Sequence, residues 1–436
     1  MPERTGVREI AVVGSGIAGL TAAYALSDVD RVTLYEKDTR LGGHAHTHEV
    51  EYAPGRFVHV DSGFIVHNDR TYPTLLRLFD ELGVATRNTD MSMSVRADRI
   101  GLEYAGAKGI AGLFPSIRNL GKPRYLALLA EVPRFHRAAS RLLRSADDTM
   151  TLADFVRAHR FSDYFLDYFL TPLVAAVWSC DPRVAGEYPA HYLFRFLDHH
   201  GMLTIYGSPT WRTVVGGSAC YVQKIAARIA EVRTGARVHA IGEDETGVLV
   251  IDDAGPRRFA AVVIATHSDQ ALAMLAEPSA HARAVLTAMP YSVNPAQLHT
   301  DESILPTAKR AWASWNYRVP APDRDADGVV VTYDLTRLMG LEHVTDRRFL
   351  VTLGGRELID PGRVIVEMTY EHPVYTPESV AAQLRLPDLD TDRIAFAGAY
   401  HGWGFHEDGA SSGLRAARRI SRGRLPADPA AIGVGA

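Results

Sequence analysis

Apolar residues gather in short runs near both ends of the chain and alternate with helix-like segments. Residues 10–13 form a continuous apolar run that predicts a buried parallel strand, and the Ala- and Leu-rich segment after Gly19 predicts a helix. A second buried strand is predicted in RVTLYEKD, and apolar runs at residues 262–266 and 394–397 predict two more. Strands that alternate with helices in this way indicate an α/β domain with a parallel sheet.

The residues between these segments follow other patterns. Segments such as RYLALLAEVPRFHRAASRLL within residues 76–204 have helical spacing, whereas GVVVTYDL and RVIVEMTY within residues 276–389 predict strands. We therefore predict an α/β domain built from residues 1–75, 205–275 and 390–422, interleaved with an α+β domain built from residues 76–204 and 276–389. The Pro-, Gly- and Ala-rich residues 423–436 predict a loose tail.

The helical insert contains one region, residues 117–146, that is both basic and amphipathic. Its cations are accompanied by a single acid before residue 147, Glu131, and its apolar residues recur near helical spacing. The cations are Arg118, Lys122, Arg124, Arg134, Arg137, Arg141 and Arg144, and the apolar residues are Leu128, Leu129, Val132, Phe135, Leu142 and Leu143. Two interpretations stay open: a helix that roofs a pocket with its arginines in water, and a peripheral surface that docks on anionic phospholipid.

Composition narrows the classes of function. The 436 residues, 47% hydrophobic and 22% charged, suit a globular protein of two domains, and a formal net charge of −4 gives no reason to expect nucleic acid. Cys180 and Cys220 are the only cysteines, which argues against a disulfide scaffold or a cysteine zinc site. The most apolar run, residues 164–179, is too short and too interrupted to span a membrane, and no secretory signal is visible, so we expect a cytoplasmic protein.

A glycine-rich loop follows the first predicted strand. Gly14, Gly16 and Gly19 form G-x-G-x-x-G, and the second strand ends in an acid, Glu36. The three glycines permit a tight turn, close approach of the backbone to a pyrophosphate, and close packing of helix on strand. Glu36 is suited to accept hydrogen bonds from ribose hydroxyls and disfavours a 2′-phosphate. The order of these features predicts a dinucleotide site.

A glycine pair, Gly42 and Gly43, follows the acid in EKDTRLGG. This arrangement resembles the extended fingerprint of FAD enzymes of the amine oxidase and phytoene desaturase type. The resemblance implies a Rossmann-type FAD-binding domain, of the amine oxidase and glutathione reductase kind, interleaved with an α+β substrate domain. It also implies noncovalent FAD, because the C-terminal stretch lacks the cysteine that some amine oxidases use for attachment.

The same resemblance assigns residues to the cofactor. It implies that Val238 meets the adenine, and that a helix from about Gly409 points its N-terminus at the flavin. Ala399 departs from the pattern, since many relatives carry an acid there to hold the ribityl chain. The residues expected to bind FAD are Gly14, Ser15, Gly16, Ile17, Ala18, Gly19, Glu36, Lys37, Gly42, Gly43, His44, Gly63, Phe64, Val238, Thr266, Gly398, Ala399, Gly409 and Ala410.

Three histidines, His44, His46 and His48, stand behind the glycine pair. Their spacing of two places them on one face of a predicted strand. They are interpreted as strand residues, with one contact to flavin or substrate and a shared metal as the open alternatives. We expect no metal, because no carboxylate or cysteine is evident as a third ligand.

The loop before Gly409 is expected to pass the flavin, which makes Tyr400, His401, His406 and Glu407 the candidate catalytic residues. His406 and Glu407 have a second interpretation as caps of the helix that opens at Gly409. On a predicted strand of the second insert stand Trp312, Trp315 and Asn316, as core residues or as the lining of a pocket.

Further segments, among them PTWRTVVGGSACYV, TYEHPVYTP and GAYHGWGFHEDGASSGLRAA, are similar to bacterial amine-oxidase-like flavoproteins and to the N-terminal flavoprotein domain of plant cyclopropane fatty acid synthases. This resemblance implies an FAD-dependent oxidoreductase of the desaturase or isomerase type. Hydride would move at C–H bonds of an apolar substrate, an unsaturated or methylated fatty acyl chain. It also implies a cyclopropane synthase-like methyltransferase as partner.

Two alternatives remain open. The first is a flavin amine oxidase that produces H2O2, for which Lys309 is the one lysine of the second insert. The second is a non-catalytic flavoprotein partner of a lipid methyltransferase. If the basic region docks on lipid, the expected location is peripheral, on the inner face of the membrane.

Overall fold

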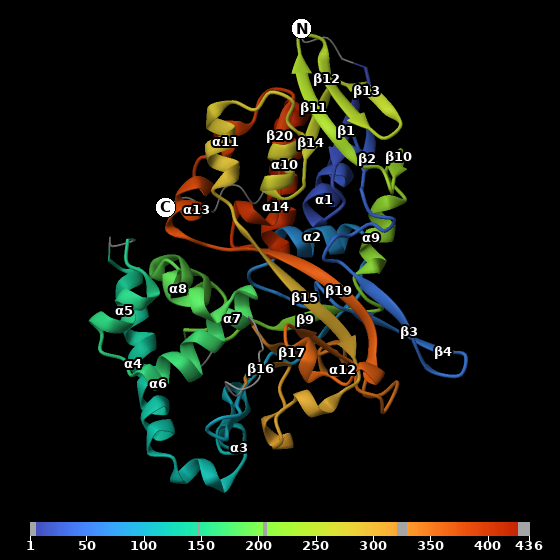
Figure 1. Ribbon diagram of the computed structural model, residues 1–436. Helices are drawn as coiled ribbons and strands as arrows, with labels where there is room; N and C mark the ends of the chain where they lie inside the picture. The colour runs from blue at the N-terminus through green and yellow to red at the C-terminus, as the bar shows by residue number, and fades with distance from the viewer. Residues whose placement is uncertain (1–5, 146–148, 204–206, 321–328, 426–436) are drawn as a thin grey trace.

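The computed structural model describes residues 6–145, 149–203, 207–320 and 329–425 (Figure 1). Of the tail predicted at residues 423–436, residues 426–436 lie outside the described residues. The elements form two units, an upper and a lower one in the view of Figure 1, and the chain passes between them several times.

A five-stranded sheet forms the centre of the upper unit. Its order is β10-β2-β1-β14-β20, and all its pairings are parallel. The central strands are buried on both faces, which explains their continuous apolar sequences. All three segments assigned above to the dinucleotide domain contribute strands. These are β1 (Glu9–Val13), β2 (Arg31–Tyr35), β10 (Glu231–Arg233), β14 (Ala261–Ile264) and β20 (Ile394–Phe396).

Helices and one small antiparallel sheet surround the five-stranded sheet, and a second small sheet packs against the core of the lower unit. The helices α1 and α14 pack together closely, because a Cβ on Gly413 would lie 2.1 Å from the carbonyl oxygen of Ala18. The helices are α1 (Ile17–Leu26), α2 (Pro73–Glu81), α9 (Ala219–Ala226), α10 (Ser268–Met274), α11 (Ala280–Thr287), α13 (Pro377–Gln383) and α14 (His406–Ser421). The small sheets contain β3 (Thr47–Ala53) with β4 (Arg56–Asp61), and β11 (Val238–Asp244), β12 (Gly247–Asp252) and β13 (Gly255–Phe259).

A seven-stranded sheet, in the order β19-β15-β18-β17-β16-β7-β8, forms one side of the lower unit. Both inserts contribute to it, because β7 from the first insert pairs in parallel with β16 from the second. Its strands are β7 (Met93–Ala97), β8 (Leu102–Ala105), β15 (Tyr291–His299), β16 (Trp315–Val319), β17 (Val331–Asp334), β18 (Leu350–Leu353) and β19 (Val364–Pro373). A sheet of β5 (His67–Asn68), β9 (Trp211–Val214) and β6 (Thr86–Asn88) lies between the units.

Helices from the first insert form the other side of the lower unit (Figure 1). They pack around Phe135 of α4, which is fully buried among the rings of Phe155, Phe165 and Phe194. The helices of this unit are α3 (Gly109–Leu113), α4 (Pro123–Leu143), α5 (Leu152–Ala158), α6 (Asp163–Phe165), α7 (Thr171–Trp178), α8 (Ala190–His199) and α12 (Leu335–Met339).

Some element boundaries differ from the sequence predictions. The domain boundary predicted at residue 75 falls inside α2, a helix that packs against α14. The C-terminal helix begins at His406 rather than near Gly409, and the strand behind the glycine pair begins at Thr47 rather than at His44. No helix among the described residues is both long enough and apolar enough to cross a bilayer.

Candidate functional site

A cavity of about 850 Å³ extends from the carboxyl ends of β1, β2 and β14 to the sheet of the lower unit. Its walls include the glycine loop after β1, the loop after β2, strand β19 and the start of α14. The carboxyl ends of parallel strands are where α/β sheets bind their ligands. The volume lies within the range for cofactor and substrate sites.

The glycine loop is shaped by close backbone contacts. Gly14 has φ +99°, and its N–H donates to Tyr35 O at 2.8 Å. A Cβ on Gly19 would lie 1.9 Å from Gly14 O, so no other residue fits beneath the loop. A Cβ on Gly16 would meet no protein atom within 4 Å and would point into open space beside the cavity. The loop therefore has no room for a side chain at Gly19, where it packs on the protein, and has free space at Gly16, beside the cavity.

Glu36 ties this loop to the segment that follows β2. Its Oε2 accepts from Ser15 N at 2.9 Å and from Ser15 Oγ at 2.5 Å, and its Oε1 accepts from Asp38 N at 2.9 Å. Gly42 N in turn donates to Ser15 O at 3.0 Å. The carboxylate thus fixes the fingerprint loop and the glycine-pair loop in one arrangement along the cavity.

Most residues expected to bind the cofactor line this cavity. They are Gly14, Ser15, Gly16, Ile17, Ala18, Glu36, Lys37, Gly43, His44, Gly63, Phe64, Val238, Thr266, Gly398 and Ala399. Four others do not line it: Gly19, Gly42, Gly409 and Ala410. Gly19 and Gly409 act in packing instead, since a Cβ on Gly409 would lie 2.6 Å from Ile17 Cγ2.

The walls contributed by the lower unit and by β9 carry aromatic and aliphatic side chains that sequence reasoning largely missed. They are Met91, Val177, Trp178, Phe196, Met202, Trp211, Trp315 and Tyr333, with Ser179 and His200 among them. Ser179 adopts a left-handed conformation with φ +49°, a strained geometry that is enriched at functional sites. No sequence motif marks these residues, because they come from several segments that are distant in the chain.

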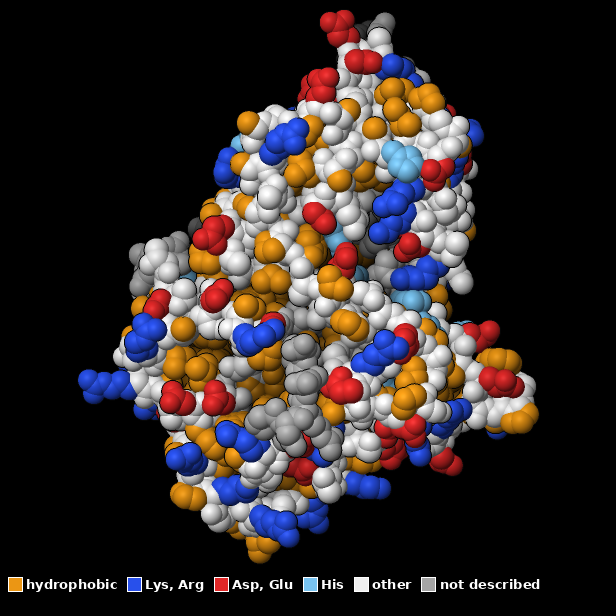
Figure 2. Space-filling view, viewed as in Figure 1, with side chains coloured by type: hydrophobic (Ala, Val, Ile, Leu, Met, Phe, Trp, Pro, Cys, Tyr) orange, Lys and Arg blue, Asp and Glu red, His pale blue; other side chains and the backbone are white. Residues whose placement is uncertain are grey.

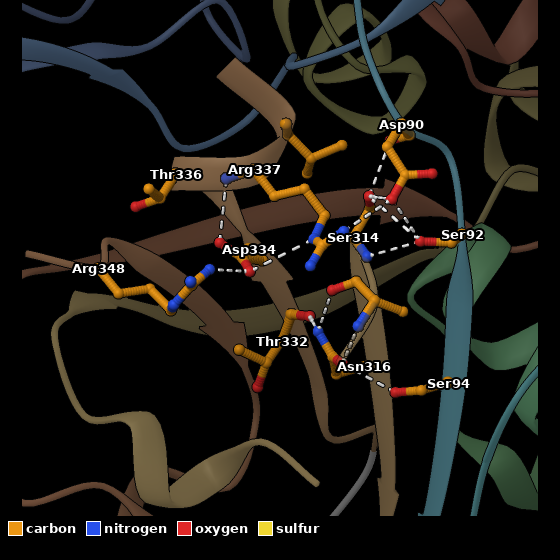
Figure 3. Close-up of polar contacts among 12 residues, drawn as sticks. Asp90, Ser92, Ser94, Ser314, Asn316, Thr332, Asp334, Thr336, Arg337 and Arg348 are labelled. Carbon is orange, nitrogen blue, oxygen red and sulfur yellow. Dashed lines mark hydrogen bonds and ion pairs between the residues drawn. The ribbon is translucent and has the colours of Figure 1, made fainter. Parts of the chain in front are cut away.

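A polar network holds the strands that present two of these walls (Figure 3). Trp315 N donates to Ser92 O at 2.9 Å, and Ser314 Oγ donates to Asp90 O at 2.7 Å, which joins β16 to the segment before β7. Asp334, at the end of β17, bonds to Arg348 and accepts from Arg337 N at 3.1 Å. Asp334 N also donates to Ser314 O at 2.9 Å, and Trp315 pairs with Tyr333 in the sheet, so both side chains are held in place without a charge on the cavity.

The three residues expected on this strand separate in the structure. Trp315 lines the cavity, whereas Trp312 lies away from it and donates from Nε1 to Pro306 O at 2.6 Å. Asn316 is buried and donates to Ala313 O at 2.7 Å. Of these three residues, Trp315 alone lines the cavity.

A family model described as flavin-containing amine oxidoreductase matches residues 17–349. The chain belongs to this family. Two solved structures share its fold. Cyclohexylamine oxidase from Brevibacterium oxydans has a TM-score of 0.68 at 18% identity, with 95% of this chain and 99% of that chain covered. A CLA-producing fatty acid isomerase from P. acnes has a TM-score of 0.67 at 14% identity, with 95% of this chain and 98% of that chain covered. A comparison with curated proteins found no match.

As a member of this family the chain is an FAD-dependent oxidoreductase, and the predicted α/β fold is confirmed. Its cavity residues fit FAD: the open space at Gly16 would hold the pyrophosphate, and Glu36 and Val238 would hold the adenosine. The Nε2 of His44 is buried on this cavity without a described partner, which leaves it available to a ligand. The noncovalent attachment stays a prediction.

The candidate catalytic residues divide into two pairs. Tyr400 and His406 line the cavity of the oxidoreductase, and His401 and Glu407 do not. His406 stacks on Phe64 with ring centroids 3.7 Å apart, and its Nε2 lies 2.8 Å from Tyr221 Oη. Desolvation lowers the pKa of His406 to about 3, so its imidazole is neutral near pH 7. We therefore assign His406 a shape and hydrogen-bonding role rather than a charged one.

Glu407 stabilises a helix other than its own. Its two carboxylate oxygens accept from Thr74 N at 2.9 Å and from Leu75 N at 3.0 Å, the free N–H groups in the first turn of α2. The cap of α14 is formed by Asp408, whose Oδ2 accepts from Phe405 N at 2.9 Å. The capping interpretation was thus correct in kind for Glu407 but wrong about the helix that it caps.

Asp408→Asn is expected to make the free energy of unfolding less sensitive to pH. Desolvation raises the pKa of Asp408 from 3.8 to about 7, so the folded chain holds a proton that the unfolded chain releases. Stability from this group is full below the unfolded pKa and falls as pH rises toward 7, by on the order of 1 kcal/mol per unit. Urea unfolding of both proteins at several pH values between about 4 and 7 measures the difference. Identical pH slopes would contradict the assignment.

The three histidines behind the glycine pair do not share one environment. His44 lies on the cavity before the strand begins, 5.0 Å from the ring of Tyr370. His46 and His48 face each other at 4.0 Å and join a hydrogen-bonded group, in which Ser62 Oγ lies 2.7 Å from His48 Nε2 and 2.6 Å from Tyr370 Oη. Among the described residues, no cluster of three His, Cys, Asp or Glu side chains is arranged to hold a metal.

Proposed function

We propose that the protein transfers hydride at a C–H bond of an unsaturated or methylated fatty acyl chain, as a desaturase or an isomerase. The observation that carries the proposal is the uncharged aromatic and aliphatic wall beside the cofactor cradle. Bound FAD would supply the hydride acceptor. Residues such as Trp178, Phe196 and Trp315 would exclude water and orient the chain, which this chemistry needs more than an acid–base pair.

The charges around the cavity support an apolar substrate. The charged residues of its lining are Glu36, Lys37, Asp38, Arg40, Arg237 and Glu371. The first five lie on the loops that bear the dinucleotide fingerprint and its neighbours, and Glu371 lies 3.0 Å from His267 Nδ1. The aromatic wall has no carboxylate or lysine among its described lining residues, so a hydrocarbon chain would meet no unpaired charge there.

Three of the histidines on the cavity are uncharged as well. Desolvation lowers the pKa of His200 and of His372 to about 4, and that of His44 falls well below its usual range. A neutral imidazole leaves the site accessible to an apolar chain at physiological pH. The fold shared with a CLA-producing fatty acid isomerase also supports an acyl substrate.

Amine oxidation is the second candidate, favoured by the family and by the aromatic rings, which attract cations. Lys309, the lysine considered for that chemistry, lies on a surface turn with Nζ 5.2 Å from the Trp312 ring and does not line the cavity. The resemblance to the plant synthase domain and the partnership with a cyclopropane synthase-like methyltransferase remain predictions within this proposal.

Anaerobic mixing separates the candidates. We expect an unsaturated fatty acid or phospholipid to bleach the flavin absorbance, or to emerge with a shifted double bond when analysed by mass spectrometry, while primary amines do neither. Trp315→Ala should lower the rate of the lipid reaction by about 10-fold or more, because the acyl chain loses an apolar contact that contributes about 2 kcal/mol. Trp312→Ala is the matched control and should leave the lipid reaction unchanged, because Trp312 does not line the cavity.

Reduction by amines with H2O2 release on exposure to air would instead support the amine oxidase. If neither class of compound reacts, and lipids of cells with and without the protein are identical by mass spectrometry, these results would support the non-catalytic flavoprotein instead.

A further inference from the structure

The lower end of the molecule carries exposed apolar side chains among cations. We name this surface the basic tip: it consists of α3, the turn η2 (Ile117–Gly121), the first turns of α4 and the turn η6 (Lys309–Ala311). Nine large hydrophobic side chains are exposed among the described residues, and four of them lie here. They are Ile110 (80% exposed), Ile117 (83%), Leu120 (55%) and Leu126 (42%). Apolar exposure on this scale marks an interaction surface.

The segments of the tip are held together, so their side chains form one surface. Asn119 Nδ2 and Tyr125 Oη both donate to Leu113 O, at 3.3 and 2.8 Å, which joins η2 and α4 to the end of α3. The turn η6, which belongs to the second insert, contacts α3. The tip is thus ordered by buried polar contacts while its apolar side chains stay outside.

The charge of the tip has one sign. No acid occurs between Glu103 and Glu131, and the cations of the tip are Arg118, Lys122, Arg124, Lys309 and Arg310. Arg118, Arg124 and Arg310 form no ion pair with a described residue. Glu103, the nearest acid before the tip, is engaged by Thr307 N at 2.7 Å and Ala308 N at 2.9 Å. Figure 2 shows Lys and Arg side chains around hydrophobic atoms at this lower end.

We propose that the basic tip docks the protein on the surface of an anionic phospholipid bilayer. The cations would meet the phosphate layer, and the isoleucine and leucine side chains would enter the boundary between headgroups and acyl chains. Charge complementarity selects this occupant, because apolar side chains separated by unpaired cations suit an anionic interface better than a continuous apolar face of a protein partner. Docking needs no turnover, so it does not depend on the proposed substrate.

The structure separates the cations of the basic region that the sequence placed together. Arg137, Arg141 and Arg144 stand near the far end of α4, around a hollow with Leu203. The helix has 21 residues, which separates its ends by about 30 Å. The single basic region of the sequence is therefore two separate surfaces, and the apolar exposure lies on the first of them.

Co-sedimentation of the FAD-loaded full chain with vesicles tests the proposal. Binding is expected to vesicles of phosphatidylcholine mixed with phosphatidylglycerol, and it should fall as salt is added. Arg118→Gln and Arg124→Gln should each weaken binding about five-fold, and together about 25-fold. Ile117→Ser should weaken binding without changing its salt dependence, because it removes no charge. Arg137→Gln with Arg141→Gln is the matched control and should leave the affinity unchanged.

Several results would overturn the docking. Equal binding to pure phosphatidylcholine would remove the role of charge, and no binding at low salt would remove the surface itself. An equal loss in the Arg137 and Arg141 control would move the contact to the side of α4. Light scattering that shows a dimer lost in Ile117→Ser would assign the tip to a second copy of the chain. Failure of lipid to reduce the flavin would count against the proposed function alone.

Discussion

Gly16→Val is expected to yield a folded protein without flavin. A Cβ at this position meets no protein atom within 4 Å, so the fold has room for the side chain. The isopropyl group would occupy the space assigned to the pyrophosphate, and the backbone N–H groups at the start of α1 would be shielded. Loss of two hydrogen bonds to a charged phosphate weakens binding by about 100-fold or more. The ratio of flavin absorbance to protein absorbance after purification measures the effect.

Gly19→Val separates the cofactor role from the packing role. Its Cβ would lie 1.9 Å from Gly14 O, a backbone atom that cannot move aside, so the variant should lose stability as well as FAD. Both variants are compared with wild-type apoprotein in urea, because bound FAD by itself raises apparent stability. Gly106→Val, also in open space but away from the cavity, should keep its full flavin content.

A yellow Gly16→Val protein with one FAD per chain would remove the pyrophosphate from this loop. Heat precipitation of the wild-type protein is expected to release intact FAD into solution. Flavin that stays with the precipitate would show covalent attachment and would point to His44, which lines the cavity.

Asp334→Ala is expected to reduce the free energy of unfolding by about 3 kcal/mol. The Asp334 side chain is fully buried, pairs with Arg348 and caps α12 through Arg337 N (Figure 3). Removal leaves two guanidinium groups short of a partner. Each keeps one other acid, Glu302 at 3.6 Å or Asp90 at 3.1 Å, which holds the loss to the lower end of the range for buried ion pairs.

Two matched substitutions show which part of the interaction matters. Asp334→Asn keeps the acceptor for the helix cap and should lose less stability than alanine. Asp360→Ala removes an exposed carboxylate 3.6 Å from Arg363 and should change stability by less than about 1 kcal/mol. Urea unfolding measures all three variants. An equal loss in Asp334→Asn and Asp334→Ala would show that the cap contributes nothing and that charge carries the whole effect.

The cofactor half of the site could be predicted because its chemistry is local in sequence. The run from β1 through Gly14, Gly16 and Gly19 to Glu36 is one strand–helix–strand unit, and each role follows from backbone geometry within about thirty residues. The strands β14 and β20 were found for a similar reason, since strands buried on both faces have continuous apolar sequences.

The substrate half could not be predicted, because its members are distant in sequence and share no motif. Trp178, Trp211 and Tyr333 come from three segments and meet only when the seven-stranded sheet, β9 and the helical insert pack around the cavity. The sequence left Trp312 and Trp315 open as core residues or pocket lining and did not distinguish them, because burial against a neighbouring element decides which side chain faces the cavity.

The sequence by itself determined that the chain binds a dinucleotide through an α/β domain, since a backbone loop and one acid suffice for that site. The tertiary structure decided which helix Glu407 caps. Its Oε2 accepts from Leu75 N in the first turn of α2, which lies 332 residues away in the chain. The tertiary structure also divided the basic region into two surfaces, because helix length sets how far apart its cations lie. Periodicity gives the faces of a helix, but only packing shows which of them meets water, protein or ligand.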